Sequence, residues 1–261
     1  MIAADEIDNI RERYRRRDQA QGGLPAGSLF QVYRCMVHQE KERAFLKILS
    51  RFGYAAIQSK TVLEIGAGFG ANILQFLRWG FLPENITVND CLPDRCAQAR
   101  KILPIGIRVI EANALDLDLP EGSFDIVLVS TVFTSILDRE FQERLATKIW
   151  VLVKPGGAVL WYDFIFDNPA NPDVKGMPRR RVLELFPQAK VSMRKITLAP
   201  PIARAVCRFH PGLYSAFNWF SFLRTHLVGW LEKPLGKPAA TGEQGVSSGE
   251  APPCGAWPPK G

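Results

Sequence analysis

Apolar runs of strand length alternate with helical stretches through the middle of the chain. Because such strand–helix repeats usually form parallel strands joined by right-handed crossovers, they predict helices on both faces of one sheet. The runs are apolar almost throughout, as expected for strands that are covered on both sides. The strand-like runs are 61–65, 86–90, 107–110, 124–129 and 157–162, and the helical stretches are 70–79, 93–103, 139–153 and 178–186.

The segments before and after this middle region predict two further helices, two further strands and a tail. Residues 1–20 and 31–52 have helical patterns, and 191–198 and 226–232 resemble two last strands. The C-terminal stretch consists mainly of Pro, Gly, Ala and Ser, which predicts a disordered tail. We therefore divide the chain into an N-terminal helical cap or lid at 1–57, an α/β domain at 58–236 with a helical insertion at 199–224, and the tail at 237–261.

The composition fits a globular protein of the cytoplasm. The chain has 261 residues, of which 47% are hydrophobic and 23% charged, so it can bury a sizeable core. It has no apolar run long enough to span a bilayer, and its N-terminus runs straight into charged residues, unlike a secretory signal. Its five cysteines are scattered, and no His/Cys spacing typical of a zinc site occurs, so we expect reduced thiols and no metal.

The formal net charge of +7 leaves three kinds of partner open. Nucleic acid, an anionic membrane surface and an anionic substrate would each be attracted by excess positive charge. The Lys and Arg residues are spread along the chain and form no long basic tract, so a solvated basic surface is the simplest interpretation.

The strongest local motif is Val62-Leu-Glu-Ile-Gly-Ala-Gly-Phe-Gly70, in which three glycines separate a strand from a helix. Glycines at such a turn allow a ligand to approach the backbone closely. The spacing departs by one residue from the dinucleotide motif G-x-G-x-x-G. Glu64 lies just before the turn, where its negative charge would repel a pyrophosphate. This site therefore favours a cationic or amine-bearing ligand.

Polar groups follow the next three strands, at the edge where parallel sheets bind ligands. Asp90 ends the second strand and can accept hydrogen bonds from both hydroxyls of a ribose. Asn113 follows the third strand and can pair with the edge of an adenine, which Ala114 and Leu115 would flank. Residues 130–132 end the fourth strand and would close the pocket beneath the ligand.

This order of motifs resembles that of class I S-adenosylmethionine-dependent methyltransferases, and most closely the methyltransferase type 11 group. The resemblance covers roughly residues 58–165 and rests on Glu64-x-Gly66-x-Gly68-x-Gly70, Asp90, Asn113-Ala114, Leu119-Pro-Glu-Gly-Ser-Phe-Asp125 and Lys154-Pro-Gly-Gly157. It implies a doubly wound, Rossmann-like α/β fold with a mostly parallel sheet of about seven strands, the last of them antiparallel. It also implies S-adenosylmethionine as the cofactor.

The family assigns roles to the matching positions. The carboxylate matching Asp90 holds the ribose, the glycine loop wraps the methionine part, and the position of Asn113, more often Asp in the family, contacts the adenine amino group. We therefore expect thirteen residues to form the cofactor site: Glu64, Gly66, Ala67, Gly68, Gly70, Asn72, Asp90, Cys91, Asn113, Ala114, Leu115, Ser130 and Thr131.

A weaker resemblance concerns the acceptor. Residues 162–173, 198–202 and 223–226 resemble a bacterial subgroup associated with assembly of surface polysaccharides. It implies transfer of the methyl group to a hydroxyl of a sugar or another small molecule. Such a reaction benefits from a general base, for which we rank His38 first, then Asp163, then His226.

Two other functions remain open. A nucleic-acid methyltransferase is favoured only by the net charge, and the chain has no Asn-Pro-Pro-Tyr-like motif after the fourth strand. A non-catalytic cofactor-binding scaffold could dock at a membrane through the aromatic-rich residues 213–231. Peripheral contact with the inner face of the membrane is also compatible with an enzyme. The sequence does not indicate the oligomeric state.

Overall fold

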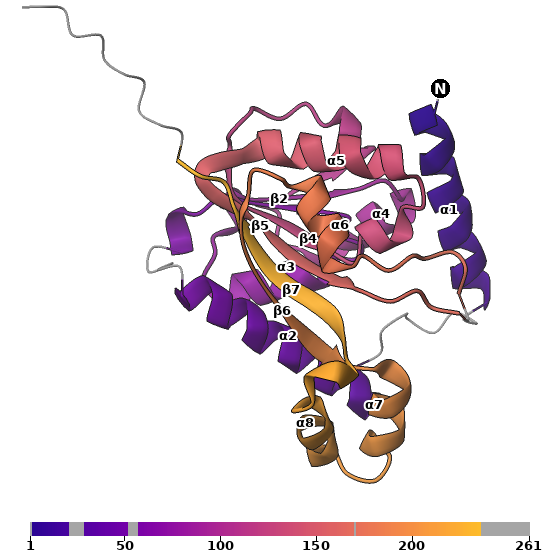
Figure 1. Cartoon of the computed structure of the whole chain (residues 1–261). Coiled ribbons are helices and arrows are strands. Elements are labelled where there is room, and N and C mark those ends of the chain that lie inside the picture. Colours follow the sequence, from indigo (N-terminus) through magenta and orange to yellow (C-terminus); the bar gives the residue numbers. More distant parts are fainter. Residues whose placement is uncertain (1, 21–28, 52–56, 170, 236–261) are drawn as a thin grey trace, which may run out of the picture.

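A twisted seven-stranded sheet forms the centre of the computed structural model, which describes residues 2–20, 29–51, 57–169 and 171–235 (Figure 1). The strand order is β3-β2-β1-β4-β5-β7-β6, as in a doubly wound fold. The predicted tail at 237–261 lies outside the described residues. The strands are β1 (Val62–Ile65), β2 (Ile86–Asp90), β3 (Arg108–Glu111), β4 (Phe124–Ser130), β5 (Val153–Phe164), β6 (Lys190–Leu198) and β7 (Arg224–Glu232).

The strand directions confirm the predicted sheet. The first five strands are parallel to one another, and β7 is antiparallel to both β5 and β6. The helices also lie where the sequence pattern predicts them, within a few residues. They are α1 (Ile2–Ala20), α2 (Val32–Arg51), α3 (Ala71–Arg78), α4 (Pro93–Ile102), α5 (Arg139–Leu152), α6 (Arg179–Leu185), α7 (Pro200–Cys207) and α8 (Gly212–Asn218).

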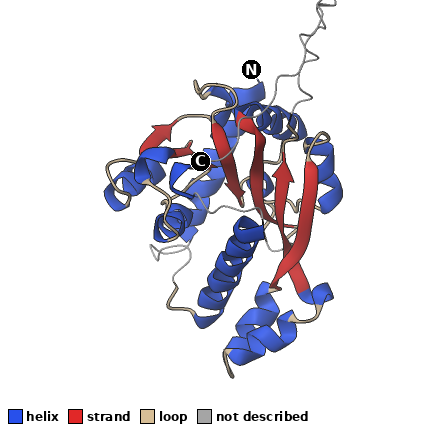
Figure 2. Ribbon diagram, turned by 90° about the vertical axis from the view of Figure 1, so that its left-hand side faces the viewer, coloured by secondary structure: helices blue, strands red, loops and turns tan. Residues whose placement is uncertain are grey.

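Helices cover both faces of the sheet (Figures 1 and 2). One hydrophobic cluster joins the sheet to α1, α5 and α6 through residues such as Ile10, Ile149 and Val182. The other joins it to α2, α3 and α4 through residues such as Phe45 and Phe76. Every residue of β1 is buried, so this strand can present polar groups only where it ends. The predicted cap is thus divided, because α1 and α2 belong to different clusters.

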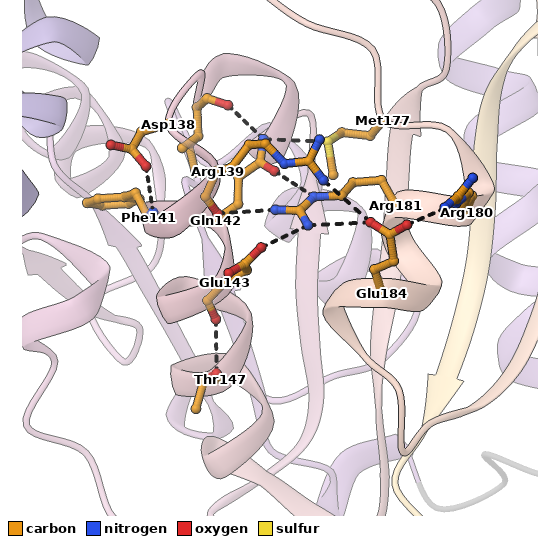
Figure 3. Close-up of polar contacts among 11 residues, drawn as sticks. Asp138, Arg139, Phe141, Gln142, Glu143, Thr147, Met177, Arg180, Arg181 and Glu184 are labelled. Atoms are coloured by element: carbon orange, nitrogen blue, oxygen red, sulfur yellow. Dashed lines mark hydrogen bonds and ion pairs between the residues drawn. The ribbon is translucent and has the colours of Figure 1, made fainter.

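A buried arginine fastens α6 to α5 (Figure 3). The Nε of Arg181 donates to Oε1 of Gln142 at 3.1 Å, and its two terminal nitrogens donate to Oε1 of Glu143 and to the carbonyl oxygen of Arg139. Such charge-assisted bonds offset the desolvation cost of burying a guanidinium. The segment after β5 is therefore held firmly against the sheet-covering helix α5.

The predicted insertion forms a small helical unit beyond one end of the sheet (Figures 1 and 2). Its helices α7 and α8 bury a small core that includes Ala203, Val206 and Tyr214. Glu40 of α2 holds this unit in place, because its carboxylate accepts 2.6 Å hydrogen bonds from the Tyr214 hydroxyl and the Asn218 amide. None of the helices in the described ranges is long and apolar enough to cross a membrane.

A polar network ties the strands together at their amino ends. The Asp125 carboxylate accepts hydrogen bonds from the backbone N–H and hydroxyl of Thr61, from Lys154 at 2.7 Å and from Lys60 at 3.2 Å. Burial opposes ionisation of Asp125, but the bonds from Lys154, Thr61 and Lys60 outweigh it and lower the pKa to about 2. Two residues of the family-like motifs, Asp125 and Lys154, therefore stabilise the sheet at the edge opposite the ligand site.

We expect Asp125→Asn to lower the free energy of unfolding at pH 7 by about 1–2 kcal/mol, because the variant loses charge-assisted hydrogen bonds. The folded-state pKa lies below the usual 3.8, so the stabilisation is complete above about pH 4 and is lost as the pH falls towards 2. Urea unfolding at several pH values measures this. The exposed Asp118→Asn is the control, and a deficit that stays constant down to pH 3 would contradict the assignment.

Candidate cofactor and active site

The glycine loop between β1 and α3 borders open space. Gly66 and Gly68 both have positive φ angles, of 66° and 56°, which side-chain-bearing residues rarely adopt. A Cβ atom at Gly66 would lie 2.7 Å from a methyl group of Val132, whereas one at Gly68 would meet no atom within 4 Å. The backbone at Gly68 is therefore open to a ligand, and Gly66 permits the close packing that supports it.

Asp90 connects this loop to the end of β2. Its Oδ2 accepts a 2.8 Å hydrogen bond from the Gly68 N–H, and its Oδ1 accepts a 2.9 Å bond from the Leu92 N–H. Burial raises the pKa of the carboxyl group, and these two bonds partly offset that rise. Each carboxylate oxygen can accept more than one hydrogen bond, so capacity remains for two further donors such as ribose hydroxyls.

A cavity of about 120 Å³ lies beside Asp90 and is largely apolar. The glycine loop, the ends of β2 and β3 and the segment after β4 supply most of its wall, and α1, α4 and α5 supply the rest. Among the predicted cofactor residues, six line it: Gly66, Gly68, Asp90, Cys91, Asn113 and Ala114.

Helix α1 supplies two wall residues that sequence reasoning missed, Ile7 and Ile10. Ile7 and Ile10 line the cavity together with Tyr14, and all three lie on one face of the helix. Their spacing of three and four residues was the available signal. Arg13 fixes this helix, because its guanidinium donates to Glu6 at 2.8 Å and to the carbonyl oxygen of Ser135 at 3.0 Å.

The adenine side of the site differs in detail from the prediction. The Asn113 side-chain oxygen accepts a 3.1 Å hydrogen bond from the Leu115 N–H and so caps the turn at 114–116. One acceptor direction on that oxygen and the amide N–H groups remain available to a ligand. Leu115 is not part of the cavity wall.

Thr131, which follows β4, has a φ of 57°, an unusual angle for a β-branched residue. The neighbouring Ser130 is buried. Neither residue lines the cavity, so their cofactor contacts remain predictions.

A chain of polar side chains runs behind the glycine loop. Asn72 donates to Oε1 of Glu64 at 2.6 Å and accepts a 2.6 Å hydrogen bond from the ammonium group of Lys41 on α2. Glu64 is fully buried, and its Oε2 has no hydrogen-bond partner among the described residues. Burial raises the pKa of Glu64 and lowers that of Lys41. An unpaired buried carboxylate oxygen is costly, and a ligand ammonium group would satisfy it.

Two of the three predicted general bases lie near Lys41. His226, at the start of β7, stacks on Tyr162 with ring centroids 5.0 Å apart, and the Lys41 ammonium lies 5.2 Å from the Tyr162 ring. Burial and the charge of Lys41 lower the pKa of His226 to about 4. Burial, Lys41 and Arg34 likewise lower the pKa of His38 to about 4. Both imidazoles are therefore neutral at pH 7 and able to accept a proton.

The third predicted base, Asp163, is buried and hydrogen-bonded to a neighbouring turn. It is fully buried, its Oδ1 accepts a 2.6 Å hydrogen bond from the Thr134 hydroxyl, and its Oδ2 accepts a bond from the Thr134 N–H. Burial raises its pKa to about 7 despite these bonds. These bonds hold the turn after β4, which suits a positioning role, and the role of Asp163 as a general base stays a prediction.

The described residues fit S-adenosylmethionine. Asp90 matches the ribose hydroxyls, the unpaired Oε2 of Glu64 matches the ammonium group of the methionine part, and the open backbone at Gly68 lies between them. The apolar cavity suits the adenine ring, with Asn113 at its edge. In the described ranges, no group of three or more His, Cys, Asp or Glu residues could hold a metal ion.

Comparisons with known proteins agree with this geometry. Residues 62–157 match the family described as a methyltransferase domain. No curated protein matches the sequence.

Several solved structures share the fold at low sequence identity. A SAM-dependent methyltransferase from Archaeoglobus fulgidus is 15% identical, with a TM-score of 0.53 over 74% of this chain and 94% of that one. A possible histamine N-methyltransferase from Thermotoga maritima is 16% identical, with a TM-score of 0.55 over 86% and 98%. Phosphoethanolamine N-methyltransferase 2 from Haemonchus contortus, in complex with S-adenosyl-L-methionine, is 17% identical, with a TM-score of 0.58 over 87% and 60%.

The matched segment contains the glycine loop, Asp90 and Asn113, which surround the cavity, and it is built on the strand order of this fold. Residues 62–157 therefore match a methyltransferase domain, and the chain has the fold of S-adenosylmethionine-dependent methyltransferases.

Proposed function

We propose that the protein transfers a methyl group to a hydroxyl of a sugar or another small molecule. The observation that supports this proposal is the position of His226 at the start of β7, where its ring stacks on Tyr162 and the Lys41 ammonium lies 5.2 Å from the same Tyr162 ring. An alcohol is a weak nucleophile and benefits from a base that accepts its proton. The weaker resemblance to polysaccharide-associated enzymes also supports a glycan acceptor. A cytoplasmic location and peripheral contact with the inner face of the membrane complete the proposal.

When bound, the cofactor supplies an electrophilic methyl group on its sulfonium. The chain's own residues would orient the cofactor: Asp90 and Glu64 would hold its two ends, and the backbone at Gly68 would lie against it. Helix α1 excludes water from the adenosine side through Ile7 and Ile10. Holding the acceptor in line with the methyl group lowers the barrier by reducing the entropy lost in the transition state. His226 or His38 then accepts the hydroxyl proton.

Replacing Asp90 by Ala should weaken cofactor binding by about 1–3 kcal/mol, because the ribose loses charge-assisted hydrogen bonds. Isothermal titration calorimetry with S-adenosylmethionine measures the change in Kd. The exposed Asp94→Ala, four residues further along, is the control for a general loss of negative charge. An unchanged Kd in Asp90→Ala would show that this carboxylate does not hold the ribose.

The predicted bases can be separated by substitution and by pH. We expect His226→Gln or His38→Gln to lower kcat by about 100-fold or more while the Kd of the cofactor stays constant. The exposed His210→Gln serves as the control. In the unaltered protein, kcat/KM should stay level between pH 7 and 5, because an imidazole with a pKa of about 4 remains neutral there. Full activity in both variants would exclude both histidines.

A methyl-transfer assay against a panel of acceptors tests the proposal as a whole. The panel contains nucleotide sugars, reducing-end glycans, small amines and RNA, and release of S-adenosylhomocysteine is followed for each. We expect turnover with a hydroxyl-bearing sugar. Turnover with RNA that falls steeply as salt is added would favour the nucleic-acid alternative suggested by the net charge of +7. Cofactor binding without turnover on any acceptor would favour a non-catalytic scaffold.

A further inference from the structure

The insertion between β6 and β7 has an inverted hydrophobic pattern. Its core contains small or medium side chains around the single large residue Tyr214. Its other large aromatic residues remain exposed, among them Trp219 at 84%, Phe209 at 84% and Phe222 at 74%. We call these exposed residues the aromatic surface: Phe209, Phe217, Trp219, Phe220 and Phe222. A soluble domain that folds alone buries such residues, so their exposure indicates a contact surface.

The charged side chains within residues 185–231 are all basic. The sequence from residue 185 to 231 contains no Asp or Glu, although the whole chain has 26 acidic residues. Arg204 and Arg208 are exposed on and just after α7, and Arg194 and Lys195 are exposed on β6. Aromatic residues together with Lys and Arg are typical of segments that lie at the headgroup level of an anionic bilayer.

The aromatic surface is held rigidly and lies at the edge of the sheet that carries the cofactor site. Glu40 fastens Tyr214 and Asn218 to α2, so the exposed aromatic residues are presented by an ordered unit. Phe164, at the carboxyl end of β5, pairs with His226 at the start of β7. The insertion therefore leaves the sheet beside the proposed general base, His226.

From these observations we propose that the aromatic surface docks the protein on an anionic lipid bilayer. The aromatic rings insert at the headgroup level, and the surrounding Lys and Arg side chains contact anionic headgroups. This docking rests on the membrane contact of the proposed function and names the surface and the lipid involved. It requires neither the cofactor nor an acceptor. A failure of docking can therefore be distinguished from a failure of methyl transfer.

Sedimentation of the full chain with vesicles tests the docking. We expect binding to vesicles of phosphatidylcholine mixed with phosphatidylglycerol, weaker binding to phosphatidylcholine alone, and loss of binding as salt is added. The double variant Trp219→Ser/Phe222→Ser should bind at least about tenfold more weakly, because both side chains lose apolar burial. The control is Ile105→Ser, which removes a fully exposed apolar side chain from the connection between α4 and β3.

The cationic contribution has its own pair of variants. Arg204→Glu/Arg208→Glu should reduce binding to the anionic vesicles by about tenfold. Arg144→Glu/Lys101→Glu makes the same change in charge on exposed positions of α5 and α4 and should bind nearly as the unaltered protein does. Melting temperatures close to that of the unaltered protein would show that each variant is folded.

A spectroscopic measurement locates the contact. Vesicles with brominated acyl chains should quench the fluorescence of Trp219 in the bound protein, and Trp219→Phe should lose that quenching while it still sediments. Equal binding of Trp219→Ser/Phe222→Ser and the unaltered protein would overturn the proposal. So would a concentration-dependent dimer, seen by analytical ultracentrifugation without vesicles and abolished in that double variant, because a second copy of the chain would then cover the aromatic surface.

Discussion

The burial of the central strands on both faces is the constraint from which the site follows. β1 and β4 lie between two hydrophobic clusters, and each residue of β1 is inaccessible to water. Polar groups can therefore serve a ligand only where these strands end. Glu64 is the exception within a strand, and its burial is tolerated because Asn72 donates to one of its oxygens. The other oxygen has no hydrogen-bond partner among the described residues, so a bound cationic group would stabilise this carboxylate.

The polar groups at the amino ends of the strands differ in function from those at the carboxyl ends. At the amino edge, Asp125 has several donors, which stabilise its charge and fix the register of the strands. At the carboxyl edge, the backbone takes unusual conformations at Gly66, Gly68 and Thr131, and acceptor capacity remains unused. Strain and unsatisfied groups are tolerated at this edge because the well-bonded amino edge holds the strands in place.

The sequence predicted most of the fold because the strand-like runs and the glycine loop are local signals. The predicted positions of the last two strands agree with β6 and β7 of the structure, and Gly68, Asp90 and Asn113 lie around one cavity. The parts that escaped prediction depend on contacts between distant residues. Arg13 donates a hydrogen bond to Ser135, which is 122 residues away in the sequence, and this bond helps to place α1 over the cavity. No pattern within residues 1–20 indicates which face of the sheet this helix covers.

Asp163 illustrates the same limit. Its position at the end of β5 suggested a catalytic carboxylate, but Thr134, which bonds both of its oxygens, lies 29 residues away in the chain. Reactivity depends on such partners, and the strand pattern alone does not reveal them. The hydrogen bonds from Lys41 to Asn72 and from Asn72 to Glu64 likewise join three elements, α2, α3 and β1. Asn72 and Glu64 were among the predicted cofactor residues, but the link to Lys41 depends on the fold.

Helix α2 contacts both the region behind the glycine loop and the insertion. Lys41 connects it through Asn72 to the carboxylate behind the glycine loop, and the adjacent Glu40 connects it to Tyr214 and Asn218 of the insertion. These consecutive side chains point to different partners, so a shift of the helix would disturb both sets of bonds at once. By thermodynamic reciprocity, if occupancy of one region alters the position of α2, then occupancy of the other must alter affinity at the first by the same factor.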